Sequence, residues 1–497
     1  MIRNRAFTIA AAVLLALTLG AHVYSAIALA GRDPHLDETE YVHAGWLMAN
    51  GERLYETFFE HHSPLFLGTL AALAPAEERV DVRPYFVRAR IVVSAFGGIA
   101  LASLAFVLWR AAPEAAAIAI ALLFGSGSMW LSGFAEVRAE AFALAFLLGG
   151  LALIVASRGA IGGLGVGFAV IACLWNPKWP IVSLAIGVVW LVRTEKRVAP
   201  FIAALITSVA GFAAIRAFVP FDLWWFFNYD VNLALGGVVG NRPETLARYF
   251  RGGIPFLYVP AAFRPALIVP AAMIVLASLR IDRSFARAVP LILLGAAFLE
   301  LRFVYAWPAI FPYYYLMWSI AAAATLAVLP ASIAALLRST RIARPVFLAT
   351  AAGMIVVTGA HAVAMIPARD DGGIYWRAQR ELVSRMRPND VVWLEPHRHP
   401  VSVRDAHYYW FAIYQHAAIA RTLRESERGR RFLPPFNDVP TCAPPPNLRF
   451  TLDSTRPLPQ TRECMQRLFA SGRVLRVLGA VDVYELRLLE SAAQSSR

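Results

Sequence analysis

The chain of 497 residues has few charged residues for its length. Only 16% of its residues are Asp, Glu, Lys or Arg, whereas 58% are hydrophobic. A soluble domain needs roughly 25% charged residues to cover its surface. The deficit is concentrated in long apolar runs, which excludes a purely soluble protein and indicates helices that cross a membrane.

Cysteine is also scarce, and the phosphate-binding signatures of soluble nucleotide enzymes are missing. Cys173, Cys442 and Cys464 fit neither a disulfide framework nor a zinc site, and the sequence leaves open whether Cys442 and Cys464 pair. No glycine-rich loop of the Walker or dinucleotide type is present, which argues against a soluble nucleotide as substrate. The net charge of +14 arises from short basic clusters between apolar runs, so we do not expect nucleic-acid binding.

Eleven apolar stretches are candidates for membrane-spanning helices, which need ~20 mostly apolar residues. They are 6–30, 91–109, 115–131, 139–156, 161–175, 179–192, 200–219, 256–279, 288–307, 314–337 and 345–366. The first stretch also resembles a cleaved signal peptide, but its apolar run exceeds the ~7–15 residues typical of one. We therefore expect an all-α polytopic membrane protein whose first helix is retained.

The basic residues predict the orientation of these helices. Alternate connections are short and rich in arginine, as in the clusters at 193–197, 280–287 and 338–344. The opposite set begins with a long acidic first loop, 31–90. Because cytoplasmic connections carry the excess of Lys and Arg, we expect a cytoplasmic amino terminus in the inner (plasma) membrane and an extracytoplasmic tail.

The tail, 367–497, has a different composition from the rest of the chain. It is rich in charges and prolines, and strand-like runs occur at 390–394, 473–478 and 481–488. We therefore predict two domains. Residues 1–366 form the transmembrane catalytic domain with its outer loop 31–90, and residues 367–497 form a small extracytoplasmic α/β domain.

The first outer loop carries the densest set of reactive side chains. Asp37, Glu38 and Tyr41 follow the first apolar stretch, and His61 and His62 come later in the loop. A carboxylate at this position is suited to act as a general base on an acceptor hydroxyl or amine. The alternative is a solvated acidic loop on the outer side that has no catalytic role. Carboxylates at a membrane surface are costly unless they have a function or a partner.

Later outer connections supply cations. Arg138 and Glu140 lie at the mouth of a helix, either as an interfacial ion pair or as a phosphate ligand with an orienting carboxylate. Lys178 lies between Trp175 and Trp179, as an interfacial anchor or as a point charge for a lipid phosphate.

Arg302 interrupts an apolar run together with Glu300, which indicates either a functional pair or a buried structural one. Tyr313 and Tyr314 follow, and they suit an aromatic belt as well as a sugar-binding surface. Basic groups and carboxylates from several outer connections together predict a site for an anionic lipid headgroup.

The order of short motifs along the chain carries a family resemblance. These motifs are Asp37-Glu38, Gly51…Tyr55, His62-Ser63-Pro64-Leu65, Ala89-Arg90, Arg138-Ala139-Glu140, Gly167…Lys178 and Pro312-Tyr313-Tyr314. In this respect the stretch 36–191 resembles the polyprenyl-phosphate-sugar-dependent glycosyltransferases of the GT-C class. It is most similar to the family of protein O-mannosyltransferases and lipid A aminoarabinose transferases (glycosyltransferase family 39). His62 stands where that family has a basic residue, Ser63 where it has a proline, and Glu140 where Asp is common.

The resemblance implies an inverting hexosyl- or pentosyltransferase that uses a lipid-phosphate sugar. Asp37, Glu38 and Glu140 are then catalytic, and the donor phosphate is bound by His62, Arg138, Lys178 and Arg302. Tyr41, His61, Tyr313 and Tyr314 bind the sugar or acceptor, which is a cell-envelope glycan, lipid or protein. No cofactor is required, although Asp37 and Glu38 are compatible with a divalent metal.

Three other functions fit parts of the pattern. A transporter or flippase also places charges in the bilayer, but it is expected to show paired repeats and broken helices at mid-membrane. A polysaccharide polymerase or ligase often centres its chemistry on a late outer loop, whereas here the first loop is the richest. A catalytically inactive relative is the third. The sequence leaves open the sugar, the acceptor and the oligomeric state.

Overall fold

In the computed structural model, the described residues are 5–126, 128–194, 198–234, 263–281, 285–303, 312–337, 352–353, 356, 373–394, 399–409, 414–434, 447–452, 473–478 and 483–488. The chain divides into two compact units. The helical unit comprises Met1–Leu29, Arg90–Ala214 and Gly240–Ala368. The loop–tail unit comprises Ala30–Ala89, Ile215–Val239 and Arg369–Arg497. Each unit is described separately below.

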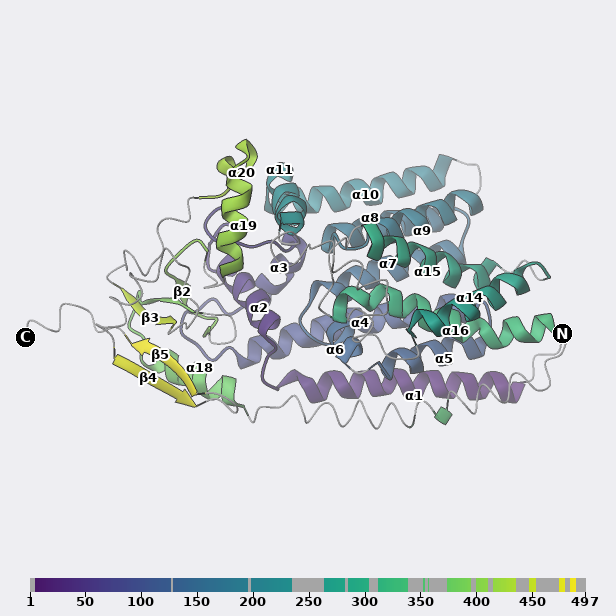
Figure 1. Ribbon diagram of the computed structural model, residues 1–497, viewed down its shortest axis with the longest axis horizontal. Helices are drawn as coiled ribbons and strands as arrows, with labels where there is room; N and C mark the ends of the chain where they lie inside the picture. The colour runs from purple at the N-terminus through teal and green to yellow at the C-terminus, as the bar shows by residue number, and fades with distance from the viewer. Residues whose placement is uncertain are drawn as a thin grey trace, which may run out of the picture. The chain divides into compact units, whose positions relative to one another are not determined.

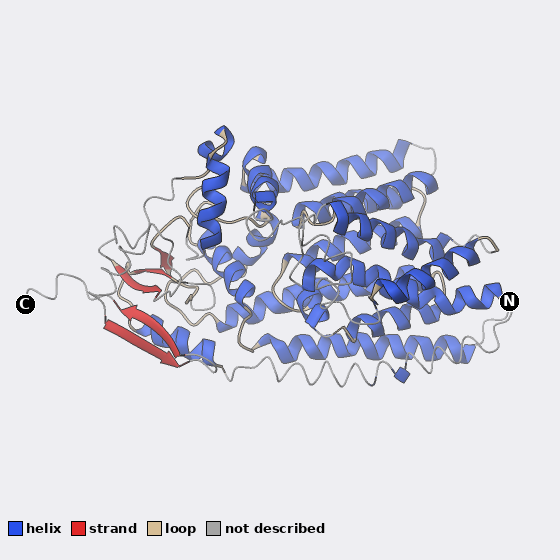
Figure 2. Ribbon diagram, viewed as in Figure 1, coloured by secondary structure: helices blue, strands red, loops and turns tan. Residues whose placement is uncertain are grey.

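The helical unit consists of apolar helices (Figures 1 and 2). The long ones are α1 (Arg5–Ala30), α4 (Arg83–Trp109), α7 (Ala139–Ala156), α10 (Val198–Phe218), α15 (Phe285–Phe303) and α16 (Leu316–Leu336). The shorter ones are α5 (Pro113–Phe124), α6 (Ser128–Phe134), α8 (Ala160–Trp175), α9 (Pro180–Arg193) and α14 (Pro265–Leu279). The 3-10 turn η4 (Pro312–Tyr315) leads into α16.

Most predicted spans coincide with a described helix, with one difference. Residues 115–131 were expected to form one helix, but α5 ends at Phe124 and α6 begins at Ser128. The break follows Gly125, a poor helix former, whose N–H still bonds to the carbonyl of Ala121. The stretch 345–366 lies outside the described residues except at 352–353 and 356.

Among the described residues, five helices are long and apolar enough to cross a membrane, and four shorter apolar helices accompany them. The predicted total of eleven spans stays a prediction. Apolar side chains on α1 and α10 are exposed, as Ile27 at 69% and Leu205 at 63% illustrate. Because such a surface is unfavourable in water and suited to lipid, the chain is a multi-pass membrane protein.

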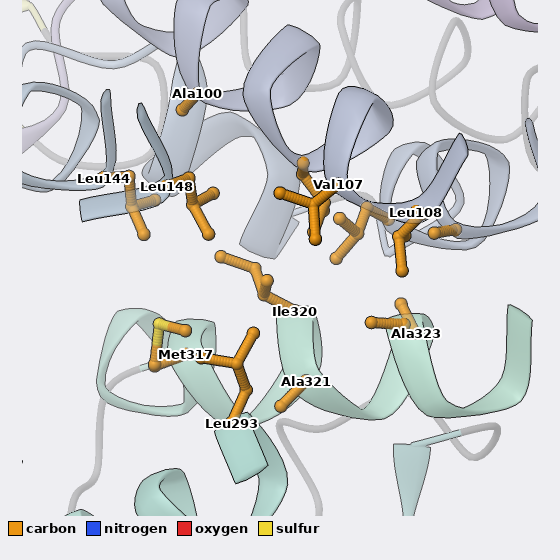
Figure 3. Close-up of a cluster of buried hydrophobic side chains, with 14 of the residues drawn as sticks. Ala100, Val107, Leu108, Leu144, Leu148, Leu293, Met317, Ile320, Ala321 and Ala323 are labelled. Atoms are coloured by element: carbon orange, nitrogen blue, oxygen red, sulfur yellow. The ribbon is translucent and has the colours of Figure 1, made fainter. Parts of the chain in front are cut away.

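The core of the helical unit lies between α4, α5, α7, α15 and α16. Figure 3 shows part of it, where leucine and valine side chains of α4, α7 and α15 face small and apolar side chains of α16. The labelled residues are all buried: Ala100, Val107, Leu108, Leu144, Leu148, Leu293, Met317, Ile320, Ala321 and Ala323. Helices in lipid associate through van der Waals packing and small residues, because lipid tails are as apolar as leucine. The alanines therefore let α16 approach its neighbours closely.

Glycine allows a close helix contact in this unit, between α7 and α8. A Cβ atom on Gly150 would lie 2.4 Å from the carbonyl oxygen of Gly165, and one on Gly165 would lie 2.4 Å from that of Gly150. Both separations are far below van der Waals contact, so only glycine fits at either position. This contact sets the spacing between the helix that carries Glu140 and the helix that precedes Lys178.

The loop–tail unit contains a five-stranded sheet in the order β2-β1-β3-β5-β4. Its strands are β1 (Val391–Trp393), β2 (Arg404–Asp405), β3 (Leu448–Leu452), β4 (Arg473–Leu478) and β5 (Val483–Leu488). Strand β1 is parallel to β2 and β3, whereas β5 is antiparallel to β3 and β4. The three strand-like runs of the sequence are thereby confirmed as β1, β4 and β5.

Helices complete the loop–tail unit. They are α2 (Leu36–Ala49), α3 (Pro64–Ala71), α11 (Phe221–Trp225), α18 (Ile374–Ser384), α19 (Tyr414–Arg424) and α20 (Glu427–Phe432), with a π-helical turn η1 at Phe226–Asp230. The predicted mixed α/β character of the tail is therefore confirmed. Cys442 and Cys464 lie outside the described residues, so their pairing stays open.

The first loop and the tail pack together within this unit. The amide of Phe59 donates to the carbonyl of Tyr408 at 2.7 Å, and the hydroxyl of Tyr408 donates to the carbonyl of Tyr55 at 2.8 Å. Arg404 of the tail pairs with Glu78 at 2.9 Å and also with Glu52. The predicted boundary near residue 367 stays a prediction, and the compact unit groups the tail with residues 30–89.

Candidate functional site

A capping box fixes the start of α2, where the predicted catalytic carboxylates lie. Oε2 of Glu38 accepts the N–H of His35 at 2.8 Å, and Nδ1 of His35 accepts the N–H of Asp37 at 3.4 Å. Carboxylates are favoured in the first turn because they face the positive end of the helix dipole. Glu38 is buried, whereas Asp37 is half-buried. Glu38 thus organises the helix start, and Asp37 is the more accessible carboxylate.

Glu60 organises the second half of the first loop. It is 1% exposed, and its Oε1 accepts the N–H groups of His61 at 2.7 Å and His62 at 3.1 Å, as well as Nδ1 of His62 at 2.6 Å. The ring of Tyr41 packs edge-on against that of His62, with centroids 4.6 Å apart. Glu60 therefore sets the position of His62, and Nε2 is the nitrogen of that ring directed away from Glu60.

A metal ion has a candidate site in this loop. Ligand atoms of Glu40, Glu60, His61 and His62 all lie within 4.8 Å of one another. Oε2 of Glu60 is buried and accepts no hydrogen bond from any described residue. Neither Glu40 nor Glu60 was among the residues predicted for the site from the sequence. The signal was the spacing of Glu60-His61-His62, which places a carboxylate and two imidazoles on adjacent residues.

In the helical unit, the structure brings together three of the predicted residues. Nζ of Lys178 lies 2.6 Å from Oε1 of Glu140 and 5.1 Å from the ring centroid of Tyr314. Arg138 is the N-cap residue of α7, two positions before Glu140, and its Nε lies 3.3 Å from Oε2 of Glu136. The side chains of Arg138 and Glu140 are 2% exposed, and that of Lys178 is 21% exposed.

Two polar contacts hold the loop that carries Lys178. The N–H of Lys178 donates to Oδ1 of Asn176 at 3.3 Å. Oε2 of Glu300, on α15, accepts the N–H of Val182 in the first turn of α9 at 2.9 Å. The sequence marked Glu300 as half of an ionisable pair, and the structure gives it a capping role at α9. The side chains of Arg302 and Tyr313 lie outside the described residues.

This arrangement is suited to binding the phosphate group of a ligand. Arg138 and Lys178 carry two positive charges, and Glu136 and Glu140 balance them. An ammonium has three donors, so the bond to Glu140 is compatible with a further bond to a phosphate oxygen. Such a charge-assisted bond is stronger in apolar surroundings, where the effective dielectric is low. The roles of Asp37, Glu38 and His62 in the other unit stay predictions.

Comparison with known proteins gives a likeness in structure alone. No family model matches the chain, and no curated protein sequence matches it. The crystal structure of ArnT from Cupriavidus metallidurans bound to undecaprenyl phosphate is similar over 97% of this chain and 98% of that one, with TM-score 0.58 and 13% identity. The oligosaccharyltransferase of Archaeoglobus fulgidus in its apo form covers 87% of this chain and 69% of its own, with TM-score 0.47 and 11% identity. The likeness to ArnT shows that the chain has a GT-C-like fold.

Proposed function

We propose, on the premise of this GT-C-like fold, that the protein transfers one sugar from a polyprenyl-phosphate carrier to a cell-envelope acceptor. The observation that carries the proposal is the cluster of Arg138, Glu140 and Lys178 beside Tyr314. ArnT, the similar structure over nearly the whole chain, was solved with undecaprenyl phosphate. A lipid phosphate needs cations next to apolar helices, and this cluster supplies them at the start of α7.

The proposed reaction is an inverting displacement at the anomeric carbon. The acceptor oxygen or nitrogen attacks that carbon while its bond to the phosphate oxygen breaks, and polyprenyl phosphate leaves with the electron pair. Arg138 and Lys178 stabilise the negative charge that grows on the phosphate. Glu140 holds the ammonium of Lys178 in place, and Asp37 accepts the proton of the nucleophile. His62 and Arg302 are further candidates for the phosphate, and Tyr41, His61, Tyr313 and Tyr314 for the sugar or acceptor.

The proposed location is the inner membrane of a bacterial cell, with the amino terminus in the cytoplasm and the loop–tail unit outside. The basic connections support this orientation through the positive-inside rule. Single cysteines introduced at Arg110 and at Glu56, in a chain without its native cysteines, provide the test. A membrane-impermeant thiol reagent should label position 56 and not position 110 in intact cells, and the reverse pattern would overturn the orientation.

A divalent cation fits the first-loop group of Glu40, Glu60, His61 and His62 better than Asp37 and Glu38. The buried Oε2 of Glu60 offers an unsatisfied ligand atom, whereas a carboxylate oxygen of Glu38 is engaged in the capping box. Oxygen and imidazole donors suit Zn²⁺ or Mn²⁺. A bound ion would add positive charge to the loop. Its requirement is tested by transfer with EDTA and by metal content in Glu60→Gln.

Transfer by the purified protein in lipid vesicles is the decisive test. A panel of labelled polyprenyl-phosphate sugars is offered with membrane extract as acceptor, and wild type is compared with Asp37→Asn. General-base catalysis contributes roughly 10²- to 10⁴-fold, so the variant should lose transfer while it still inserts and binds the lipid. Glu56→Gln is the matched control, because Glu56 is an exposed carboxylate of the same loop that pairs with Arg53.

The possible outcomes separate the alternatives. Transfer of one sugar by wild type and by Glu56→Gln, but not by Asp37→Asn, supports the proposal and identifies the donor. Full transfer by Asp37→Asn would remove Asp37 as the base. Lipid binding without transfer of any sugar would favour an inactive relative. Absence of both would favour a transporter.

A further inference from the structure

A closed cluster of three titratable side chains joins α2 to the tail. Nε2 of His43 lies 2.6 Å from Oδ2 of Asp405, and Nε2 of His399 lies 3.0 Å from Oδ1 of the same carboxylate. The side chains of both histidines are 0% exposed, and that of Asp405 is 6% exposed. A charge can be buried to this degree only when it is paired and hydrogen-bonded.

The backbone of Val401 determines which nitrogens carry protons. Its carbonyl oxygen lies 2.6 Å from Nδ1 of His43, and its N–H donates to Nδ1 of His399 at 3.0 Å. Nδ1 of His399 is therefore an acceptor, so the proton of that ring is on Nε2, which donates to Asp405. Nδ1 of His43 faces an acceptor and must donate.

A neutral His43 with its proton on Nδ1 would leave no proton between its Nε2 and an ionised Asp405. Because Nε2 and Oδ2 lie 2.6 Å apart, a further proton must lie in this bond. Burial alone raises the pKa of Asp405, but the charge of His43 and the bonds from both histidines bring this pKa below its usual value. The geometry therefore places a proton in each of the two bonds of His43, one to the carbonyl of Val401 and one to the carboxylate of Asp405. Burial, and next the charge of His43, lowers the pKa of His399 to about 4, which keeps that ring neutral.

A metal ion fits this cluster poorly, although its three ligand atoms lie close enough together. A neutral imidazole that binds a metal through Nε2 must carry its proton on Nδ1. In His399, Nδ1 accepts the N–H of Val401. Binding a metal at Nε2 would therefore place a proton on Nδ1 of His399, where it would face the N–H of Val401. The hydrogen bonds favour a proton on Nε2 instead of a metal ion.

We propose that His43, Asp405 and His399 form a proton-holding junction that positions α2. The helix carries Asp37 six residues before His43, so an anchor at His43 fixes the segment that holds the proposed base. The tail contributes the other two residues, and Trp46 of the same helix stacks on the ring of His43 with centroids 5.9 Å apart. The three residues are positioning residues, because they act through Asp37. This inference rests on the proposed function for its activity readout only.

Acid should open the junction through a second proton. Among the described residues of the tail, Asp405 and His399 are the titratable groups that act on His43, and the two histidines are those that act on Asp405. A proton added to Nδ1 of His399 would face the N–H of Val401, and a proton added to Asp405 would remove an acceptor from His43. Either event breaks a hydrogen bond inside the junction, so α2 loses its anchor.

The protonation pattern can be measured without activity. The chain has 10 histidines, so ¹⁵N-histidine spectra of the protein in lipid nanodiscs are tractable, and His43→Asn and His399→Asn assign two of the signals. At pH 7.5 we expect His43 with protons on both nitrogens and His399 with its proton on Nε2. Neutral His43, or one tightly bound zinc per chain that is lost in His399→Asn, would overturn the proposal.

Variants test the positioning role. His399→Asn keeps an acceptor for the N–H of Val401 but does not titrate, so the acid limb of the transfer profile should move to lower pH. Asp405→Asn should lower kcat by on the order of 10- to 100-fold, the range expected for a displaced catalytic group, with little change in the KM for the donor. Asp405→Glu, which keeps the charge, should restore part of the loss.

The matched control is His407→Asn. His407 makes the same local bond as His399, since its Nδ1 accepts the N–H of Tyr409 at 3.1 Å. We expect its pH profile to match wild type. An acid limb that does not move in His399→Asn would overturn the junction. If no variant or wild type transfers any sugar, the proposed function fails, and the spectra and the pH dependence of unfolding still decide the junction.

Discussion

Two buried charge clusters among the described residues differ in whether they are complete. In the helical unit, Lys178 pairs with Glu140 and is 21% exposed. In the loop–tail unit, His43, Asp405 and His399 satisfy one another, and both histidines are 0% exposed. A cluster that is to bind a ligand must keep a donor within reach of it, whereas a cluster that holds two segments together is most stable when it is closed.

The clusters also differ in how far apart their residues lie in the chain. Lys178 follows Glu140 by 38 residues, and one helical hairpin joins them. Asp405 follows His43 by 362 residues. Local packing of α7 on α8 therefore assembles the first cluster, but the second needs the whole chain.

Removal of the Lys178 ammonium should have the largest effect on transfer. Lys178→Met should lower transfer roughly 10²- to 10³-fold, about 3 to 4 kcal/mol, as loss of one stabilising donor does elsewhere. Glu140 then loses its partner, so the folded state is destabilised as well, and transfer is compared at a temperature below the unfolding midpoint of the variant. The sequence contains one other lysine, Lys196, and Lys196→Met is the control. Equal loss in both variants would contradict a role in phosphate binding.

Acid should have the second largest effect, through the cluster of His43, Asp405 and His399. The pKa of His399 is lowered from 6.5 to about 4, so the unfolded chain binds a proton there that the folded chain does not. The contribution of His399 to stability is thus complete above pH 6.5 and falls as the pH drops from 6.5 to 4, by roughly 3 kcal/mol in all. The midpoint of chemical unfolding, followed by tryptophan fluorescence between pH 8 and 4, measures this loss. His399→Asn should flatten the curve.

A single added methyl group between α7 and α8, the helices next to the Glu140–Lys178 cluster, should lower stability. In Gly150→Ala the new carbon would lie 2.4 Å from the carbonyl oxygen of Gly165, so α7 and α8 must separate at a cost of about 1–3 kcal/mol. Transfer should fall as well, since the helices carry the cluster. In Gly149→Ala the nearest atom, Oγ of Ser103, is 3.8 Å away. That variant should match wild type in thermal stability and in transfer.

Loss of the cap at α9 should have the smallest effect. Glu300→Ala removes the acceptor of the Val182 N–H, which costs about 1 kcal/mol for a typical cap. The midpoint of thermal unfolding in lipid should fall slightly, and Glu300→Gln, which keeps an acceptor, should fall less. A larger loss of transfer than of stability would show that Glu300 also positions Lys178.

Much of this architecture could be predicted from the sequence, because apolar length and strand alternation are local signals. The runs at 139–156 and 473–478 became α7 and β4 with the predicted bounds. The meeting of Glu140 with Lys178 could be expected from two helices joined by a short connection. The break at Gly125 was missed, because a single glycine inside an apolar run resembles tolerated helix interior.

Other features depend on contacts that no local pattern encodes. His43 lies in the middle of α2, and nothing near it in the sequence indicates a partner in the tail. In the sequence, Glu60 is one of several acidic residues in the first loop. Only the structure shows that its Oε1 accepts three N–H groups from the two following histidines. Side-chain roles that arise from long-range pairing are therefore visible only in three dimensions.

The distance in sequence between His43 and Asp405 has a consequence for biosynthesis. A ribosome that adds about 5–20 residues per second needs roughly 20 to 70 seconds to make the intervening chain. During that time α2 has no anchor, since its partner residues do not yet exist. A chain truncated before residue 405 can insert its helices but cannot close the junction. In the proposed junction, α2 therefore gains this anchor only after residue 405 has been made.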